Sequence, residues 1–163
     1  MNHEELLLEN QICFLVYRLN RAIGAAYRPL LEALGLTYPQ YLVMLVLWEN
    51  GALPVGDICR LLDLDTGTVS PLIKRMEASG LLVRERQAHD ERTVNVSLTD
   101  EGKALQKKAL PIPTALGSCL FADFSEYGPL KETLLTLNQR LDTTMHYNER
   151  DQASSNKVSK GFI

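Results

Sequence analysis

Three cysteines are the strongest candidate nucleophiles of this chain: Cys13, Cys59 and Cys119. A thiolate reacts with peroxides and disulfides and binds metals, so each could carry redox or metal chemistry. None lies in a Cys-x-x-Cys pair or near a histidine at zinc-ligand spacing, and three cysteines cannot all pair within one chain. The sequence therefore predicts no metal and no other cofactor, and the open question is whether one thiol is reactive. For Cys59 we expect only packing.

A second group of useful side chains lies in the middle of the chain. Residues 66–92 hold five basic and four acidic residues, whereas the whole chain has a formal net charge of -3. This contrast has the right sign for local contact with an anionic partner, but it is small.

Composition bounds the class of protein. The chain has 163 residues, of which 45% are hydrophobic and 23% charged, which suits one domain with a core and excludes a large multidomain enzyme. The negative net charge argues against a uniformly basic coat for nucleic acid and against a polybasic membrane binder. Residues 1–5 are acidic, unlike a secretion signal, and the longest apolar run, residues 41–48, is too short for a bilayer. We expect a cytoplasmic protein with no membrane partner.

Long apolar stripes mark both ends of the chain. Apolar residues at steps of three and four from Leu8 to Leu30 predict a helix that ends near Pro29, and a similar stripe from Leu130 to Met145 predicts a last helix. The polar tail at 148–163 is expected to be mobile. Between them, Thr37, Pro39 and Gln40 predict the start of a buried helix over residues 39–49, closed by Asn50-Gly51.

The central segment has the pattern of two short helices followed by a hairpin. Residues 55–62 form an amphipathic helix with Leu61 among its inward positions, and a second helix begins near Thr66, contains Pro71 with a small expected kink, and stops at Gly80. Residues 81–86 and 93–98 are strand-like, with a polar tip between them. Thr99 caps a further helix that breaks near residues 111–113. The predicted fold is mainly α (α+β), a winged helix-turn-helix.

Such a unit binds DNA because a helix fits the major groove while the wing reaches the adjacent backbone or minor groove. The outward face of the second helix and the wing offer groups for phosphates and base edges: Thr66, Thr68, Ser70, Lys74, Arg75, Arg84, Arg86, His89 and Arg92. The alternative is a solvated helix and hairpin in a protein-binding module.

Two segments carry a family resemblance. Asp90-Glu91-Arg92 with Leu98-Thr99 and Gly102 resembles the wing of MarR-type transcriptional regulators, and residues 72–77 with Gly80-Leu81 resemble their recognition helix. The resemblance spans roughly residues 8–146. It implies a homodimer on a palindromic double-stranded operator, with dimerisation helices at 1–36 and 108–147 and a DNA-binding region at 37–107. It also implies that Arg92 enters the minor groove and that Asp90 steadies it, although Asp90 could be a turn residue.

One branch of this family senses organic hydroperoxides, and Gln11-Ile12-Cys13-Phe14 with residues 36–41 resembles that branch. The resemblance implies that Cys13 is the peroxide-reactive thiol and that Tyr27 and Tyr38 donate hydrogen bonds to its sulfur from the partner subunit, which would favour the thiolate. Cys119 then resolves the sulfenic acid as a disulfide. The alternatives without redox chemistry are that Cys13 is a buried apolar side chain and that the two tyrosines only pack at an interface.

The sequence therefore predicts a repressor that releases its operator when Cys13 is oxidised by an organic hydroperoxide. Two alternatives remain at this point. The first is a MarR-type repressor that is released by a small phenolic or aromatic ligand, with Cys13 inert. The second is a thiol peroxidase, against which the sequence has no motif for reductive recycling.

Overall fold

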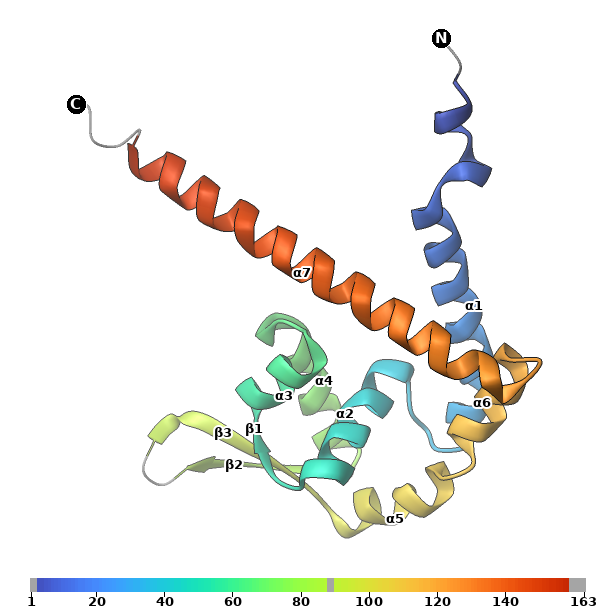
Figure 1. Cartoon of the computed structure of the whole chain (residues 1–163). Helices are drawn as coiled ribbons and strands as arrows, with labels where there is room; N and C mark the ends of the chain where they lie inside the picture. The colour runs from blue at the N-terminus through green and yellow to red at the C-terminus, as the bar shows by residue number, and fades with distance from the viewer. Residues whose placement is uncertain (1–2, 88–89, 159–163) are drawn as a thin grey trace. The chain divides into compact units, whose positions relative to one another are not determined.

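The computed structural model describes the backbone of residues 3–87 and 90–158, and the side chains of residues 3–86 and 93–143. The chain divides into two compact units, residues 1–116 and residues 117–163. Helices dominate both, and the first unit also contains a small antiparallel sheet (Figure 1), so the mainly α winged-helix prediction is confirmed. Within the described residues, no helix is long and apolar enough to cross a membrane.

The first helix differs from its prediction at both ends. Two short 3-10 turns, Glu4–Leu6 and Leu8–Asn10, precede α1, which spans Ile12–Glu32. The amides of Asn10 and Gln11 donate to the carbonyl oxygens of Glu4 and Glu5 at 2.7 and 2.6 Å, which closes these turns before the helix begins. Pro29 lies inside α1 and does not end it, because a proline costs one helical hydrogen bond and the rest of the turn continues.

Helix α2, Tyr38–Asn50, follows the sequence prediction closely. Gln40 Oε1 accepts from the backbone N–H of Thr37 at 2.8 Å and from its hydroxyl at 3.0 Å, so the predicted capping residues meet. Gly51 ends the helix at φ 73°, a backbone conformation that a side chain disfavours. The central positions of α2 are buried, as its apolar composition predicted.

The helix-turn-helix consists of α3, Val55–Leu62, and α4, Thr66–Ala78. Asp63 turns the chain between them in the left-handed region at φ 52°. Pro71 lies inside α4. Leu61 was expected to face inward, but half of it is exposed, because α3 packs through the neighbouring Ile58 and Cys59 instead.

The wing is a three-stranded antiparallel sheet in the order β1-β3-β2. Strands β2, Leu82–Gln87, and β3, Asp90–Leu98, form the predicted hairpin, which extends beyond the helices α2, α3 and α4 (Figure 1). Leu82 pairs with Leu98 and Arg84 with Val96, and the register shifts near the tip. The short strand β1, Leu53–Pro54, was not predicted because two residues carry no alternating pattern.

One core joins these elements. Fully buried side chains from α2, α3, α4 and the sheet pack together, namely Val43, Met44, Ile58, Val69, Ile73, Met76 and Val96. Helix α5, Asp100–Ala109, begins at the cap Thr99 and is tied to α2 by a 2.9 Å hydrogen bond from Trp48 Nε1 to the carbonyl of Gly102. Helices α2 to α5 and the sheet, here called the winged unit, are therefore held together by their own residues.

The C-terminal elements are α6, Ile112–Leu120, a 3-10 turn at Phe124–Glu126, and α7, Tyr127–Val158. The break predicted near Pro111 and Pro113 separates α5 from α6, and the stretch with no clear sequence pattern forms α6 itself. In the second unit the ring of Tyr127 contacts those of Phe121 and Phe124. The backbone of α7 runs past residue 148, where the sequence placed the start of a tail, so the end of the helix was predicted too early.

Candidate DNA-reading surface and thiol site

The three thiols lie in different surroundings. Cys13 is exposed in the first turn of α1, and Cys119 is exposed near the end of α6, in the second unit. Cys59 is buried in α3, and its sulfur lies 3.8 Å from the hydroxyl of Thr66, so it packs beneath the start of α4. The two thiols that the sequence selected for redox chemistry are therefore accessible in the single chain, which removes the buried-hydrophobe alternative for Cys13 within one protomer.

The two tyrosines selected for the thiol site meet each other. The rings of Tyr27 in α1 and Tyr38 in α2 have centroids 4.6 Å apart, and Tyr27 also contacts the buried ring of Tyr41 at 5.9 Å. Burial, followed by the proximity of Tyr38 and Tyr41, raises the pKa of Tyr27 to about 12. Tyr27 therefore keeps its hydroxyl proton at neutral pH and can donate a hydrogen bond.

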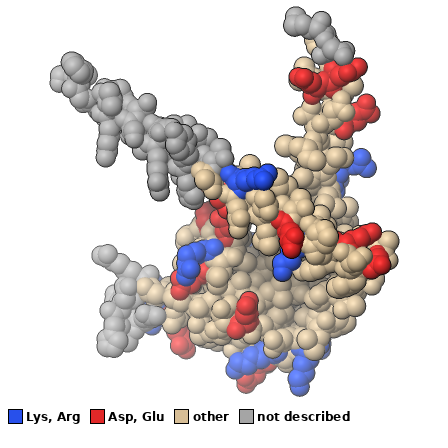
Figure 2. Space-filling view, in the orientation of Figure 1, with Lys and Arg blue, Asp and Glu red and all other residues tan. Residues whose placement is uncertain are grey.

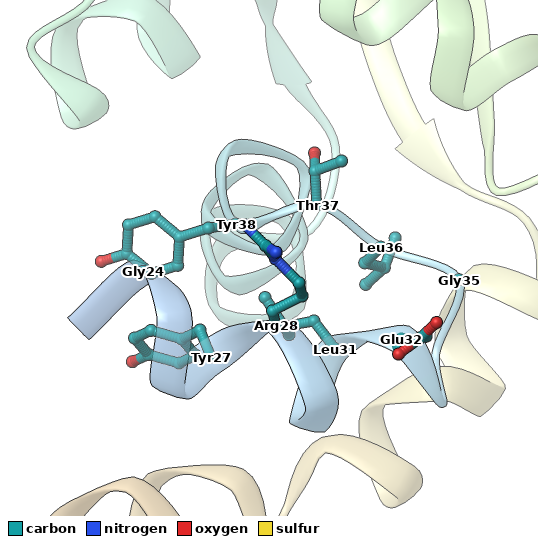
Figure 3. Close-up of a pocket in the computed structure, with 9 residues that line it drawn as sticks. All are labelled: Gly24, Tyr27, Arg28, Leu31, Glu32, Gly35, Leu36, Thr37 and Tyr38. Carbon is teal, nitrogen blue, oxygen red and sulfur yellow. The ribbon is translucent and has the colours of Figure 1, made fainter. Parts of the chain in front are cut away.

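These tyrosines line a pocket of about 410 Å³ between the end of α1 and the start of α2. Figure 3 shows the hydroxyls of Tyr27 and Tyr38 pointing to the same side, with the Arg28 side chain on the opposite side of the two rings and Glu32 further along α1. The pocket wall is completed by small or apolar residues, Gly24, Leu31, Gly35 and Leu36, and by Thr37. The phenols thus face a space that an incoming side chain can enter.

Cys13 does not reach these phenols in its own chain. Both Cys13 and Tyr27 lie on α1, fourteen residues apart. At about 1.5 Å of rise per residue they are separated by roughly 21 Å along the helix. A thiol–phenol contact can therefore form only between two copies of the chain.

Around Cys13 the surface is apolar. Ile12 is 69% exposed, and Leu15, Val16, Tyr17 and Leu19 on the same helix are also exposed. In the second unit, α7 exposes a similar series at Leu130, Leu134, Leu135, Leu137 and Leu141. Contiguous apolar surfaces of this kind mark protein–protein interfaces.

The start of α4 is fixed by a cap that sequence analysis did not single out. Asp65 accepts the backbone N–H and the hydroxyl of Thr68, both at 2.8 Å. These hydrogen bonds lower the pKa of Asp65, so its carboxylate stays charged at the helix N-terminus. The hydroxyl of Thr68, a predicted DNA contact, is thus engaged with Asp65 in the free protein.

Four of the predicted DNA contacts, Thr66, Ser70, Lys74 and Arg84, share one groove. A groove of about 620 Å³ lies between α4 and the wing, here called the α4–wing groove, and its polar lining residues are Asp57, Thr66, Ser70, Lys74, Arg84 and Thr93. The structure thus brings Thr66, Ser70 and Lys74 of the recognition helix together with a basic residue of the wing. Arg75 lies on the exposed side of α4 and donates through Nε to the carbonyl of Pro71 at 3.3 Å.

Along the wing, Arg86 is exposed on β2. The side chains of His89, Asp90 and Arg92 lie outside the described residues, so the minor-groove roles that the resemblance implies for Asp90 and Arg92 stay predictions. Figure 2 shows basic and acidic side chains interspersed over the face in view, in agreement with the small charge contrast of the sequence.

Sequence analysis also missed Tyr41 and Glu77. Tyr41 packs against Tyr27 and Trp48, and Glu77 holds the wing residue Arg84. The spacing of Asp65 and Thr68 is a recognisable cap signal, but no local pattern pairs a helix residue with a strand residue beyond a turn. Among the described residues, no group of three His, Cys, Asp or Glu side chains could hold a metal ion.

Comparisons with known proteins agree with this geometry. A family model described as transcriptional regulator SarA/Rot matches residues 25–109. The organic hydroperoxide resistance transcriptional regulator of Bacillus subtilis is 43% identical over 138 residues, which cover 85% of this chain and 94% of the relative.

Two solved structures of AbfR, a protein of Staphylococcus epidermidis, are also similar. Reduced AbfR bound to DNA matches with a TM-score of 0.77 and 39% identity over 89% of this chain and 99% of that one. Disulfide-formed AbfR matches with a TM-score of 0.61 and 38% identity over 88% of this chain and 96% of that one.

The curated relatives are transcriptional regulators and not enzymes, so this chain is a regulator rather than a thiol peroxidase. The helix-turn-helix, the wing and the family model coincide on the same segment of the chain. The chain belongs to the MarR- and SarA/Rot-type winged-helix transcriptional regulators, the family that includes the organic hydroperoxide resistance regulator of Bacillus subtilis.

Proposed function

We propose that the chain is a homodimeric DNA-binding repressor that senses organic hydroperoxides through Cys13 and releases its operator on oxidation. The observation that carries the proposal is the division of the site along α1. The exposed Cys13 and the paired phenols of Tyr27 and Tyr38 stand too far apart to meet in one chain, and an apolar surface surrounds the thiol. The resemblance to the Bacillus regulator supports the same reading.

A second copy completes the site. In two antiparallel helices related by a twofold axis, residues equally distant from the axis face each other. An axis near Asn20, midway between Cys13 and Tyr27, brings the thiol of one copy to the phenol of the other. Packing of the two α1 stripes also removes their apolar side chains from water, which favours dimerisation.

The redox step uses the thiolate of Cys13. Its sulfur attacks the terminal oxygen of ROOH, the O–O bond breaks, and the departing RO⁻ takes a proton to become an alcohol. The sulfur is oxidised to a sulfenic acid while the peroxide is reduced. Phenol hydrogen bonds from Tyr27 and Tyr38 of the second copy favour the thiolate that begins this reaction.

Cys119 is the proposed resolving thiol. Its thiolate attacks the sulfenic sulfur of Cys13 in the other copy, the S–O bond breaks, and the hydroxyl leaves with a proton as water. The exposure of Cys119 and the similarity to AbfR, of which a disulfide-formed structure exists, support this role. The disulfide requires the two Cα atoms to come within about 7 Å.

DNA reading is assigned to the winged unit. Its proposed contacts are Thr66, Thr68, Ser70, Lys74, Arg75, Arg86 and Arg92, with Asp90 steadying Arg92. Residues 37–107 form the DNA-binding region and residues 1–36 with 108–147 the dimerisation region. Such a regulator works in the cytoplasm, where it meets the chromosome.

The switch follows from geometry. Two recognition helices enter successive major grooves only when they lie about 34–36 Å apart. A new polar group or a cross-link at the dimer interface changes the angle between the two winged units. A small change of angle suffices to remove both helices from register on a palindromic operator.

The first experiment measures DNA binding before and after cumene hydroperoxide, with wild-type protein and Cys13→Ser. The DNA is a labelled duplex selected by the reduced wild-type protein from a random-sequence pool. We expect oxidation to abolish binding by wild type and to leave Cys13→Ser bound. Equal loss in both proteins would end the sensing claim and leave a DNA-binding regulator with another trigger, such as a small phenolic ligand.

The second experiment tests Cys119. Intact-mass analysis of peroxide-treated protein under non-reducing conditions is expected to find a covalent dimer that disappears in Cys119→Ser, while the matched control Cys59→Ser keeps it. A covalent dimer in Cys119→Ser would assign the resolving role elsewhere.

A further inference from the structure

The recognition helix and the wing are joined by one ion pair with two points of contact. Arg84 on β2 donates its backbone N–H to Glu77 Oε1 at 3.1 Å and its side-chain Nε–H to Glu77 Oε2 at 2.7 Å. Glu77 lies in the last turns of α4, so both oxygens of a single carboxylate are used to hold one residue of the wing. A hold of this kind fixes direction as well as distance.

The Glu77–Arg84 pair lies where it can set the direction of the wing. Arg84 lines the α4–wing groove, where Ser70 and Lys74 of the recognition helix also lie. The backbone of Arg84 pairs with Val96, which is fully buried in the core. The pair therefore lies between the part of the hairpin fixed by the core and the part that extends toward the tip.

The Glu77–Arg84 pair matters more for the direction of the wing than for the stability of the fold. The side chains of Arg84 and Glu77 are 30% and 34% exposed, and ion pairs with such access to water add little to the stability of a fold. The base of the hairpin is secured independently, because Met76 O accepts from Leu81 N and Gly80 O accepts from the hydroxyl of Thr99. Loss of the pair would leave the fold in place and free the wing to change its angle.

We propose that Glu77 and Arg84 are positioning residues for DNA reading, which set the angle between the recognition helix and the wing so that both meet adjacent grooves of one duplex. The proposal rests on the DNA-binding part of the proposed function and not on the peroxide chemistry. It assigns Arg84 a role different from the free phosphate contact that its position in the wing suggests.

The negative charge of Glu77 makes the proposal testable, because positioning and simple charge repulsion predict opposite changes in DNA affinity when that charge is removed. A carboxylate beside DNA repels phosphates, so its neutralisation alone should strengthen binding to any duplex. Positioning predicts the opposite for a specific site, because a wing at the wrong angle loses its contacts. The two effects separate when specific and non-specific DNA are compared.

The experiment uses the full-length protein kept reduced, so that Cys13 oxidation plays no part. Affinities are measured for the duplex selected from a random pool and for a scrambled duplex of the same length and composition. Glu77→Gln is expected to weaken binding to the selected duplex by about tenfold while binding to the scrambled duplex is unchanged or stronger. Hydroxyl-radical footprinting should then lose the zone protected by the wing and keep the zone protected by α4.

Two matched variants complete the design. Glu85 follows Arg84 on β2, is exposed, and points to the opposite face of the strand. Glu85→Gln therefore removes the same charge as Glu77→Gln without touching the pair, and it should not weaken specific binding. Arg84→Lys keeps the positive charge but lacks the Nε–H, so it should lose specificity as Glu77→Gln does.

The proposal is overturned if Glu77→Gln and Arg84→Lys both keep the ratio of specific to scrambled affinity within about twofold of wild type. Circular dichroism and retained binding to the scrambled duplex check the fold of each variant. If Glu77→Gln does not fold, Arg84→Lys decides the question with no change of net charge. Failure of the wild-type protein to select any duplex would instead contradict the proposed function.

Discussion

Apolar side chains are buried in the winged unit but exposed on the first half of α1. Ile58, Val69 and Met76 are fully buried within the winged unit, whereas Ile12 and Leu15 on α1 are 69% and 48% exposed. Their sequences are similarly apolar, so composition does not separate them. The difference shows that one region covers its apolar side chains with its own chain, whereas the other leaves them exposed, as the proposed dimer interface requires.

This division also separates the two kinds of chemistry. The groups proposed to contact DNA lie on the helix-turn-helix and wing, and Cys13 lies on the apolar surface proposed as the dimer interface. A covalent change at Cys13 can therefore alter how two copies meet without disturbing the fold of either reading head.

A buried and an exposed position on the same helix give the first test. Ile58→Ala on α3 removes a fully buried side chain and should lower the free energy of unfolding by about 2–5 kcal/mol. Leu61→Ala, three residues later and half exposed, should change it by no more than about 0.5 kcal/mol. Urea unfolding at one protein concentration compares them, and equal losses would mean that Leu61 is covered in the working protein.

Equally exposed leucines in the two regions give the second test. Leu15 on α1 is 48% exposed and Leu61 on α3 is 50% exposed. Leu15→Asp places a charge in the proposed interface once per copy and should raise the dimer dissociation constant by at least about 100-fold. Leu61→Asp should stay dimeric. Sedimentation equilibrium measures both, and an intact Leu15→Asp dimer would move the interface away from α1.

The third test concerns a close contact within the winged unit. A Cβ added to Gly102 would lie 2.3 Å from the carbonyl oxygen of Leu81, so Gly102→Ala should cost about 1–3 kcal/mol of unfolding free energy. Gly56 on α3 has open space, and Gly56→Ala should be neutral or slightly stabilising. Thermal unfolding of the two variants checks this, and similar midpoints would show that α5 can shift away from the sheet.

The smallest effect is a pH dependence in the tyrosine cluster. Because folding raises the pKa of Tyr27 from 10.0 to about 12, the folded protein holds this proton more tightly than the unfolded chain. The stabilisation is complete below pH 10 and is lost as pH rises through 12. Wild type should therefore lose unfolding free energy more steeply than Tyr27→Phe over this interval. Parallel curves would show that the phenol is not buried in solution.

The local structure of the winged unit was largely predictable. The cap at Thr37, the glycine at position 51 and the bounds of α3 are all short-range signals, and the structure agrees with each. Errors fell where neighbouring signals compete, as at the start of α1 and at Pro29, where the helix continued. The polar end of α7 carried too little apolar pattern to show how far the helix extends.

The candidate site was predictable only in part. Thiols and phenols were recognisable by type and by resemblance, but the contact between Tyr27 and Tyr38 depends on how α1 packs against α2. The hold of Glu77 on Arg84 likewise joins a helix to a strand beyond a turn.

By itself the sequence determined which of the longer segments become helices and strands, several of their ends, and which residues carry a nucleophile or a charge, because these depend on patterns within a few residues. Only the tertiary structure decided which apolar side chains stay exposed, which phenols face one pocket and which carboxylate holds the wing. Those outcomes depend on packing between elements distant in the chain, and no local pattern encodes that packing.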